Sequence, residues 1–263
     1  MDADGSAWAR FEQELADWDR AGMAATLWWR DDDAAAVTQE LDRLLELQDQ
    51  SALPLCLAVI PDPAEAALAA RLEGASHVHA AVHGYRHLNH APAGKKKAEF
   101  GADRPIAAMK SEIAAAWEKV HTLFGGRAVP VFVPPWNRMT DNLYPHLPQL
   151  GLRAISRKAP REPVEPQPSL AVAPSLAVAD VHLDIVDWRG TRGFIGDSEA
   201  LTQLSDCLRV RRLRRESSPT GLLTHHAVMD EAAWGFLARL FAATAENRRV
   251  CWLSAPEVFN LVA

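Results

Sequence analysis

Short apolar runs alternate with helical segments along almost the whole chain, and this alternation limits the possible folds more than any other feature. Each run has four to seven residues and is followed by a stretch in which hydrophobic side chains recur at spacings of three and four, the pattern of an amphipathic helix. Seven or eight such units occur, and none repeats the sequence of another. The alternation predicts a parallel β-sheet, either open and doubly wound or closed as a barrel.

The pattern also predicts where the individual elements lie. We expect strands at 25–29, 54–60, 78–82, 129–133, 153–156, 181–186, 221–224 and 250–253. We expect helices at 6–20, 38–48, 63–72, 103–124, 141–150, 199–214 and 230–246, and a short one from 256. The fourth of these helices should begin near Asp103, a good N-cap residue, with Pro105 in its first turn.

Length and composition are those of one large α/β domain, which we expect to span residues 1–263. The segment 159–174 holds five prolines, and we interpret it as an irregular surface loop because the strand and helix pattern resumes directly after it. A net charge of -6 argues against a nucleic-acid or membrane-surface binder. No signal-peptide pattern and no apolar run of about 20 residues is present, so we expect a cytoplasmic protein without a membrane span.

Polar side chains cluster where the expected strands end. In a (β/α) barrel the carboxyl ends of all strands meet at one rim, and catalytic residues lie on that rim. Residues far apart in the sequence would therefore come together there, which favours the barrel as the arrangement of this chain. The clusters are Asp31–Asp33, His83, Trp136-Asn137, Asp187-Trp188 and His225-His226.

His83 and His87 stand four residues apart, a spacing that on one helical turn places both imidazoles on the same face. With one carboxylate from Asp31–Asp33 they form a three-ligand set that leaves a divalent ion, such as zinc, one open position for water. A second aspartate of the run is suited to act as general base. His225 is suited to protonate a leaving group, with Asp187 to raise its pKa and fix its tautomer. The set predicts metal-assisted hydrolysis of an amide or ester.

These residues resemble the motifs of the metal-dependent polysaccharide deacetylases, the NodB-homology family, over most of the chain. The five matching segments, in family order, are Arg30–Ala34, His83–His87, Val133–Trp136, Asp184–Trp188 and Leu223–His225. The resemblance implies a distorted (β/α) barrel of seven or eight units and deacetylation of an N-acylated substrate. It also implies a divalent metal, Zn²⁺ or alternatively Co²⁺ or Ni²⁺.

Residue roles follow from the same resemblance. It assigns the metal to Asp33, His83 and His87, the base to Asp32 and the acid to His225. If the aspartate pair is instead Asp31-Asp32, the metal ligand becomes Asp32. We prefer Asp33 because helix-like spacing resumes soon after it and the small residue Ala34 follows.

The chain departs from the family pattern at three points. Gly84 replaces the serine or threonine that follows the first histidine, and Val133 replaces the arginine of the third motif. Either Arg138 or Arg30 would then supply the missing charge, or the base would lack that support. The family's sugar-polymer members are largely exported, whereas this chain shows no export signal. The resemblance therefore supports the chemistry more strongly than a polymer substrate.

Further residues near the motifs are candidates for binding substrate or supporting the ligands: Asp31, Asn89, His90, Trp136, Asn137, Arg138, Asp187 and Trp188. The run Lys95–Lys97 either belongs to a solvated loop or attracts an anionic substrate by its positive charge. The expected partner is a small-molecule or oligosaccharide substrate, and the sequence does not predict the oligomeric state. Three alternatives stay open: an iron(II) oxygenase built on the same triad, a non-catalytic carbohydrate or small-molecule binding module, and an amidohydrolase acting on another linear or cyclic amide.

Overall fold

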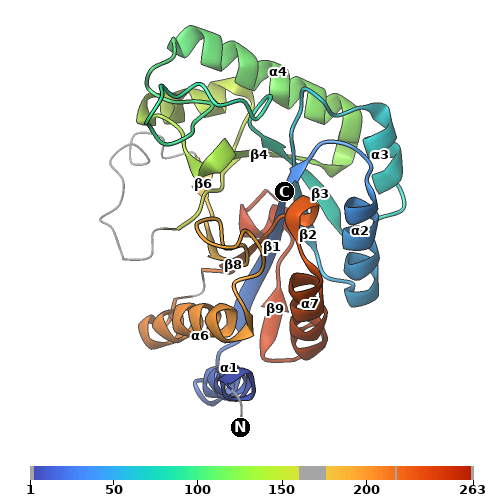
Figure 1. Cartoon of the computed structure of the whole chain (residues 1–263), viewed down its shortest axis with the longest axis vertical. Helices are drawn as coiled ribbons and strands as arrows, with labels where there is room; N and C mark the ends of the chain where they lie inside the picture. Colours follow the sequence, from blue (N-terminus) through green and yellow to red (C-terminus); the bar gives the residue numbers. More distant parts are fainter. Residues whose placement is uncertain (1–2, 160–175, 217, 262–263) are drawn as a thin grey trace.

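One curled parallel β-sheet, surrounded by helices, organises the computed structural model of the chain, which describes residues 3–159, 176–216 and 218–261 (Figure 1). The strands are β1 (Ala25–Ala34), β2 (Leu55–Val59), β3 (Val78–His83), β4 (Ala128–Val133), β5 (Ala154–Ile155), β6 (Ala177–Val178), β7 (Val181–Asp184), β8 (Thr220–Thr224) and β9 (Val250–Trp252). The α-helices are α1 (Ala3–Arg20), α2 (Gln39–Ser51), α3 (Ala66–Leu72), α4 (Ile106–Phe124), α6 (Asp197–Arg214), α7 (Glu231–Thr244) and α8 (Ala255–Val258). The 3₁₀ helices are η1 (Gly125–Arg127), η2 (Pro135–Asn137), η3 (Asp141–Leu150) and η4 (His226–Val228).

The sheet runs in the order β6-β5-β4-β3-β2-β1-β8-β7, and β9 also pairs with β1. Its two ends meet through the backbone of β5 and the segment that carries β6 and β7. The Ala177 N–H donates to the Arg153 carbonyl, and four residues further on the Val181 N–H donates to the Arg157 carbonyl. Because β7 then pairs with β8, the strands return to β1. The expected distorted (β/α) barrel is confirmed.

Alternation along β1 separates the interior of the barrel from its helical surroundings. Trp28 belongs to the inner apolar cluster, where its ring meets Phe259 edge-on at 5.6 Å. Trp29 belongs to the outer cluster and packs against Phe241 of α7 at 4.7 Å. Successive side chains of a strand point to opposite faces, so Arg30 faces inward with Trp28. The same alternation determines which aspartates of β1 reach the interior.

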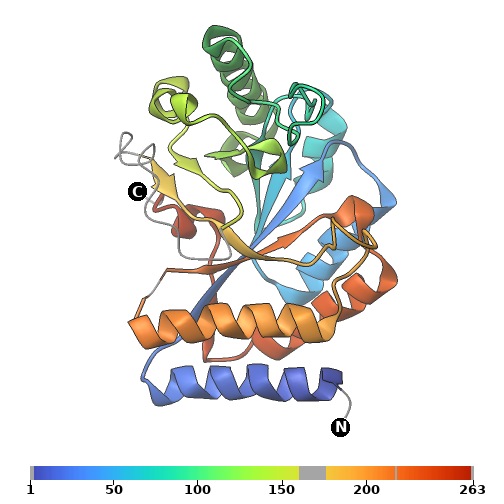
Figure 2. The same ribbon diagram turned by 60° about the vertical axis from the view of Figure 1, so that its left-hand side comes forward.

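Helix α1 lies outside the strand and helix alternation and runs along α6 (Figures 1 and 2). Phe11 and Trp18 of α1 are buried against the core. Arg212 of α6 forms a double hydrogen bond with the carboxylate of Glu14. The amphipathic pattern expected at 6–20 therefore becomes a second layer over α6. Among the described residues, no helix combines the length and the apolar character needed to cross a bilayer.

Several expected elements differ in the structure. β1 continues to Ala34, so the three aspartates lie within a strand and not in a loop after it. His83 is the last residue of β3, and the chain after it forms no helix, so the helical-turn interpretation of His83 and His87 is wrong. Asp103 does not cap α4, whose N-cap is Pro105. Two proline residues inside the expected helix 141–150 leave only 3₁₀ geometry there.

Two further points concern the region after β5. The two-residue strand β6 has no counterpart among the expected strands, since so short a segment carries no periodic signal. The proline-rich loop expected at 159–174 lies outside the described residues, apart from Ala159.

Candidate metal centre and catalytic site

Asp33, His83 and His87 converge at the carboxyl ends of β1 and β3. The Asp33 Oδ1 atom lies 3.0 Å from His83 Nε2 and 3.3 Å from His87 Nε2. The three potential ligand atoms all lie within 4.8 Å of one another. One carboxylate oxygen and two imidazole nitrogens are the donors of an open tetrahedral zinc site. The residues therefore fit a divalent metal in number, chemistry and spacing.

A local break in β1 turns Asp33 toward the histidines. Regular alternation would send Asp33 to the same face as Asp31, away from the barrel interior. The pairing of β1 with β2 shifts register between Asp31 and Ala34, and Asp33 has a φ of 72°. Positive φ is uncommon outside glycine and is tolerated best by Asn and Asp. This irregularity, of the kind that a β-bulge produces, places two neighbouring carboxylates on the site.

The Asp31 side chain points away from the barrel interior, and both of its carboxylate oxygens have polar partners. Its carboxylate accepts hydrogen bonds from the Thr224 hydroxyl and from the His226 N–H, and it also contacts His226 Nδ1. Asp31 thus joins β1 to the end of β8 on the outer side of the barrel. This geometry favours Asp32 and Asp33 over the alternative pair Asp31-Asp32.

The protonation equilibria of the three converging groups are strongly coupled. Burial alone would raise the pKa of Asp33, but the hydrogen bond with His83 and the nearby imidazoles bring that pKa well below its ordinary value. Burial would lower the pKa of His83, but the carboxylates of Asp32 and Asp33 raise it. Burial also lowers the pKa of His87, which keeps that imidazole neutral and able to bind a metal.

The His83 ring is oriented from behind by the backbone of β4. Its Nδ1 lies 3.0 Å from the Val133 carbonyl oxygen, which can only accept. Nδ1 therefore carries the proton and donates, and when His83 is neutral the lone pair of Nε2 points toward Asp33. A hydrogen bond of this kind on the far nitrogen is the usual support of a metal-binding histidine.

Asp32 is held by a buried arginine, Arg30, two residues earlier on the same face of β1. Arg30 Nη2 donates to Asp32 Oδ2 at 2.9 Å, and Arg30 Nε lies 2.8 Å from Oδ1 as an ion pair. The same guanidinium donates to the Ser156 hydroxyl and to the Asn137 side-chain oxygen. Buried charges of this kind need both an opposite charge and hydrogen-bond partners, and Arg30 has both.

His225 also lies near Asp32. Its Nε2 lies 4.0 Å from Asp32 Oδ2, and its ring meets Trp188 edge-on at 4.8 Å. His225 Nδ1 is buried and has no hydrogen-bond partner among the described residues. Asp187 does not supply one, because its carboxylate accepts the N–H groups of the loop 189–191. The expected support of His225 by Asp187 is therefore absent from the structure.

Comparisons with known proteins show which fold the chain shares. No family model and no curated protein matches the chain. A solved structure from Mycobacterium smegmatis, assigned as a polysaccharide deacetylase, is similar with a TM-score of 0.66 and 17% identity over 88% of this chain and 87% of that one. The chain has the fold of the polysaccharide deacetylases.

Two further structures show the range of proteins with this fold. A family 4 acetyl xylan esterase from Clostridium thermocellum, solved with a cobalt ion, has a TM-score of 0.52 and 13% identity over 90% of this chain and 91% of that one. A mutant of a family 4 pseudoenzyme has a TM-score of 0.54 and 12% identity over 90% of this chain and 67% of that one. At these identities the likeness establishes the fold, and the activity has to be argued from the site.

The two departures from the polysaccharide deacetylase motifs have structural explanations. A Cβ atom at Gly84 would lie 2.3 Å from Glu99 Oε2 and 2.3 Å from Pro135 Cγ, so no side chain fits there. The buried Glu99 carboxylate accepts the N–H groups of Tyr85 and Arg86 and holds the loop that carries His87. Glu99 was not among the expected site residues, because a single glutamate in a loop carries no motif.

The arginine missing at Val133 is replaced from another strand. Val133 is buried in the inner cluster of the barrel, and Arg30 reaches Asp32 from β1. Of the two candidates, Arg138 is excluded from this role because it is exposed and donates to the Lys97 carbonyl. Ser156, which fixes Arg30, was also not expected from the sequence.

The remaining expected residues divide into two groups. Trp136 packs on the His87 ring at 4.3 Å, and Asn137 accepts from Arg30, so both belong to the site. Asn89 and His90 are exposed and lie on the loop after His87. The Asn89 side-chain oxygen accepts the N–H groups of Ala91 and Ala98, which makes Asn89 a support of that loop.

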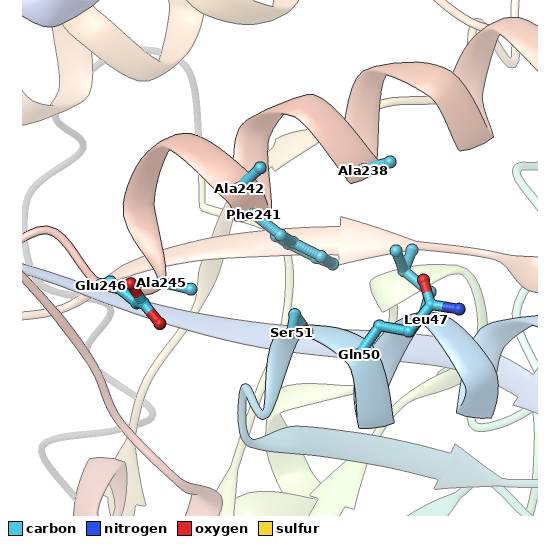
Figure 3. A pocket seen from close by; sticks show the side chains of 8 residues that line it. All are labelled: Leu47, Gln50, Ser51, Ala238, Phe241, Ala242, Ala245 and Glu246. Carbon is cyan, nitrogen blue, oxygen red and sulfur yellow. The ribbon is translucent and has the colours of Figure 1, made fainter.

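A hollow of the surface lies between α2 and α7, away from these residues (Figure 3). Side chains of Ala238, Phe241 and Ala242 face Leu47 and Gln50 across it. Its lining carries one ionisable group, Glu246, and no cluster of potential ligands. Nothing in it corresponds to the chemistry assembled at Asp33.

Proposed function

We propose that the protein is a metal-dependent hydrolase that deacetylates an N-acylated substrate, an amino sugar or a related small molecule or oligosaccharide. The observation that carries the proposal is the convergence of Asp33, His83 and His87 beside a second carboxylate, Asp32, that is paired with a buried arginine. A three-ligand site with a neighbouring base is the equipment of metal-assisted hydrolysis.

Asp33, His83 and His87 would hold the metal, which we propose to be Zn²⁺, with Co²⁺ or Ni²⁺ as alternatives. The cobalt ion in the acetyl xylan esterase of the same fold supports a divalent ion at this place. When bound, such an ion lowers the pKa of a coordinated water and polarises a carbonyl oxygen.

The chain's own residues would perform the proton transfers. Asp32, paired with Arg30, would accept a proton from the attacking water. His225 Nε2, 4.0 Å from Asp32 Oδ2, would then donate a proton to the leaving amine. General acid-base catalysis of this kind contributes about 10²–10⁴-fold each. Trp188, which packs on His225, would exclude water from that side.

The experiment is metal analysis of the purified protein together with an acetate-release assay on N-acetylated sugars. We expect about one divalent ion per chain. Asp33→Ala and His83→Ala should lose both metal and turnover, because each removes one of three ligands. Asp32→Asn should keep the metal and lose about 10²-fold or more in kcat. The matched control is Asp42→Asn on α2, which removes a carboxylate that is paired with Arg71 and not with a residue of the site.

An Asp32→Asn variant that releases acetate as fast as the wild type would remove Asp32 from the role of base. A non-catalytic binding module is the second candidate, and one observation favours it: His225 Nδ1 has no partner to orient the ring. That candidate predicts sugar binding by the metal-loaded protein without acetate release from any N-acetylated compound.

A further inference from the structure

The loop after His87 carries three consecutive lysines, Lys95–Lys97, and the structure assigns them different surroundings. Lys95 forms an ion pair with Asp103 at 2.9 Å. Lys97 Nζ lies 5.8 Å from the centre of the Trp136 ring, within the range of a cation–π contact. Lys96 is exposed and makes neither kind of contact among the described residues. The three positive charges are therefore not equivalent.

Trp136 connects Lys97 to the metal centre. Its ring centre lies 5.8 Å from Lys97 Nζ and 4.3 Å from the centre of the His87 ring. Trp136 and Asn137 both have a φ of 54°, a conformation that a non-glycine residue keeps only when its surroundings impose it. Arg30 supplies part of that constraint by donating to the Asn137 side chain. The indole is thus a fixed platform between Lys97 and His87.

A second cation stands beside Lys97. Arg138 Nη1 donates to the Lys97 carbonyl at 3.1 Å, so the guanidinium lies next to the backbone of Lys97. Neither Lys97 nor Arg138 has a carboxylate partner among the described residues, whereas Lys95 next to them does. Two adjacent unpaired cations create a local positive potential, although the whole chain has a net charge of -6.

The loop is held in place at this point, unlike a loop that is merely solvated. The Ala98 N–H donates to the Asn89 side chain, directly after Lys97. The His90 N–H donates to the Ala98 carbonyl, and Arg138 binds the carbonyl of Lys97 itself. These bonds fix the backbone from which Lys97 projects, and a fixed cation loses less conformational freedom when it binds a ligand.

We propose that the substrate is an anion, and that Lys97 and Arg138 bind its carboxylate, phosphate or sulfate group beside Trp136 while the amide lies at Asp33, His83 and His87. The inference rests on the proposed function for the position of the amide. The anionic group is recognised by a lysine point charge and by a guanidinium that can bind two oxygens at once. Trp136 provides the flat apolar surface between the two groups.

The test compares matched N-acetylated compounds that differ in one anionic group. N-acetylglucosamine serves as the neutral member, and its 1-phosphate, its 6-phosphate and N-acetylmuramic acid serve as the anionic members. Binding to the metal-loaded protein is measured by titration calorimetry and turnover by acetate release. We expect at least one anionic member to bind about tenfold tighter than the neutral one, as hydrogen bonds to charged groups imply, and to lose this advantage at high salt.

Lys97→Met and Arg138→Met should each remove most of that roughly tenfold preference, measured as the ratio of the affinities for the anionic and the neutral member. Lys96→Met is the matched control, since it removes an equal charge from the same loop without a contact to Trp136. Equal binding of neutral and anionic members, or an equal effect of Lys96→Met and Lys97→Met, would overturn the proposal. Tighter anion binding without acetate release would support the anion site and contradict the hydrolase. Hydrolysis of the neutral and anionic members at equal rate and affinity would support the hydrolase and contradict the anion site.

Discussion

Arg30 is a charged side chain with no exposed surface, deep in the interior of the barrel. An isolated charge in such a place is strongly unfavourable, and Arg30 is tolerated because its donors reach Asp32, Ser156 and Asn137. The same contacts hold the buried carboxylate of Asp32. Arg30 is therefore a positioning residue for Asp32.

The prediction at the residue scale is that an arginine at position 133 of β4 can partly replace Arg30 of β1. Arg30→Met removes the charge while keeping an unbranched side chain, and we expect kcat to fall about 10²-fold with the metal retained. Adding Val133→Arg to this variant places an arginine where the polysaccharide deacetylase motif has one. We expect the double variant to recover part of kcat, measured by acetate release at saturating metal.

Arg30→Lys is the conservative control, and it should keep more activity than Arg30→Met because it keeps the charge. Wild-type kcat in Arg30→Met would show that Asp32 does not depend on Arg30. Failure of Val133→Arg to restore activity, in a double variant that folds and binds metal, would show that the two positions are not equivalent.

The sequence predicted three side chains that converge in the structure, Asp33, His83 and His87, but not all of the residues that support them. Arg30 and Arg138 remained equal candidates, although a strict period of two along β1 places Arg30 and Asp32 on one face. Glu99 carried no signal because its role depends on the absence of a side chain at Gly84. Asp187 was expected beside His225, but its carboxylate accepts backbone N–H groups of its own loop. Aspartate often makes such hydrogen bonds in turns, and the motif did not reveal this one.

Strand β1 is the element on which the site depends. It pairs with β2, β8 and β9, and its last residues send side chains inward, outward and, after the register shift, toward β3. The sequence placed this strand correctly at 25–29 but ended it too early. Arg-Asp-Asp-Asp has low strand propensity, and only pairing with neighbouring strands and buried hydrogen bonds keep it extended to Ala34. The His83 to His87 spacing was misleading for a related reason: a strand end followed by a turn can bring the same two imidazoles together.

Close contact between β7 and β8 leads to the prediction at this scale. A Cβ at Gly221 would lie 2.7 Å from the Val181 Cα and 2.6 Å from Trp28 Nε1. Neither the backbone of β7 nor the packed indole can move freely, so Gly221→Ala should lower the free energy of unfolding by about 1–3 kcal/mol. Urea denaturation followed by circular dichroism would measure the change.

Gly235→Ala on α7 is the matched control. Gly235 lies in a helix with nothing within 4 Å of the added Cβ, and there the same substitution should raise the free energy of unfolding by about 0.5–1 kcal/mol. Equal effects of the two substitutions would mean that β7 and β8 are not packed as closely as the structure shows.

At the scale of the whole molecule, the metal triad joins parts of the chain that the barrel brings together. Asp33 belongs to β1 and His83 to β3, with β2 between them, so the site exists only when the sheet is formed. A ligand that binds only the folded state stabilises that state by its binding free energy. The ion that we propose for catalysis should therefore also stabilise the barrel.

We expect Zn²⁺ at about 100 times its Kd to add roughly 3 kcal/mol of stability, which for a chain of this size raises Tm by about 5–10 °C.

In the metal-free protein the pKa of His83 is raised by the two carboxylates. Its imidazolium therefore stabilises the fold below the unfolded pKa of about 6.5 and ceases to do so as pH rises through the folded pKa. Protons and metal compete for the same nitrogen, and the increment in Tm should be full above the folded pKa of His83 and shrink as pH falls through it. Differential scanning fluorimetry with and without chelator measures it. His83→Ala should show no increment at any pH, and an increment that persists in this variant would place the stabilising ion elsewhere in the molecule.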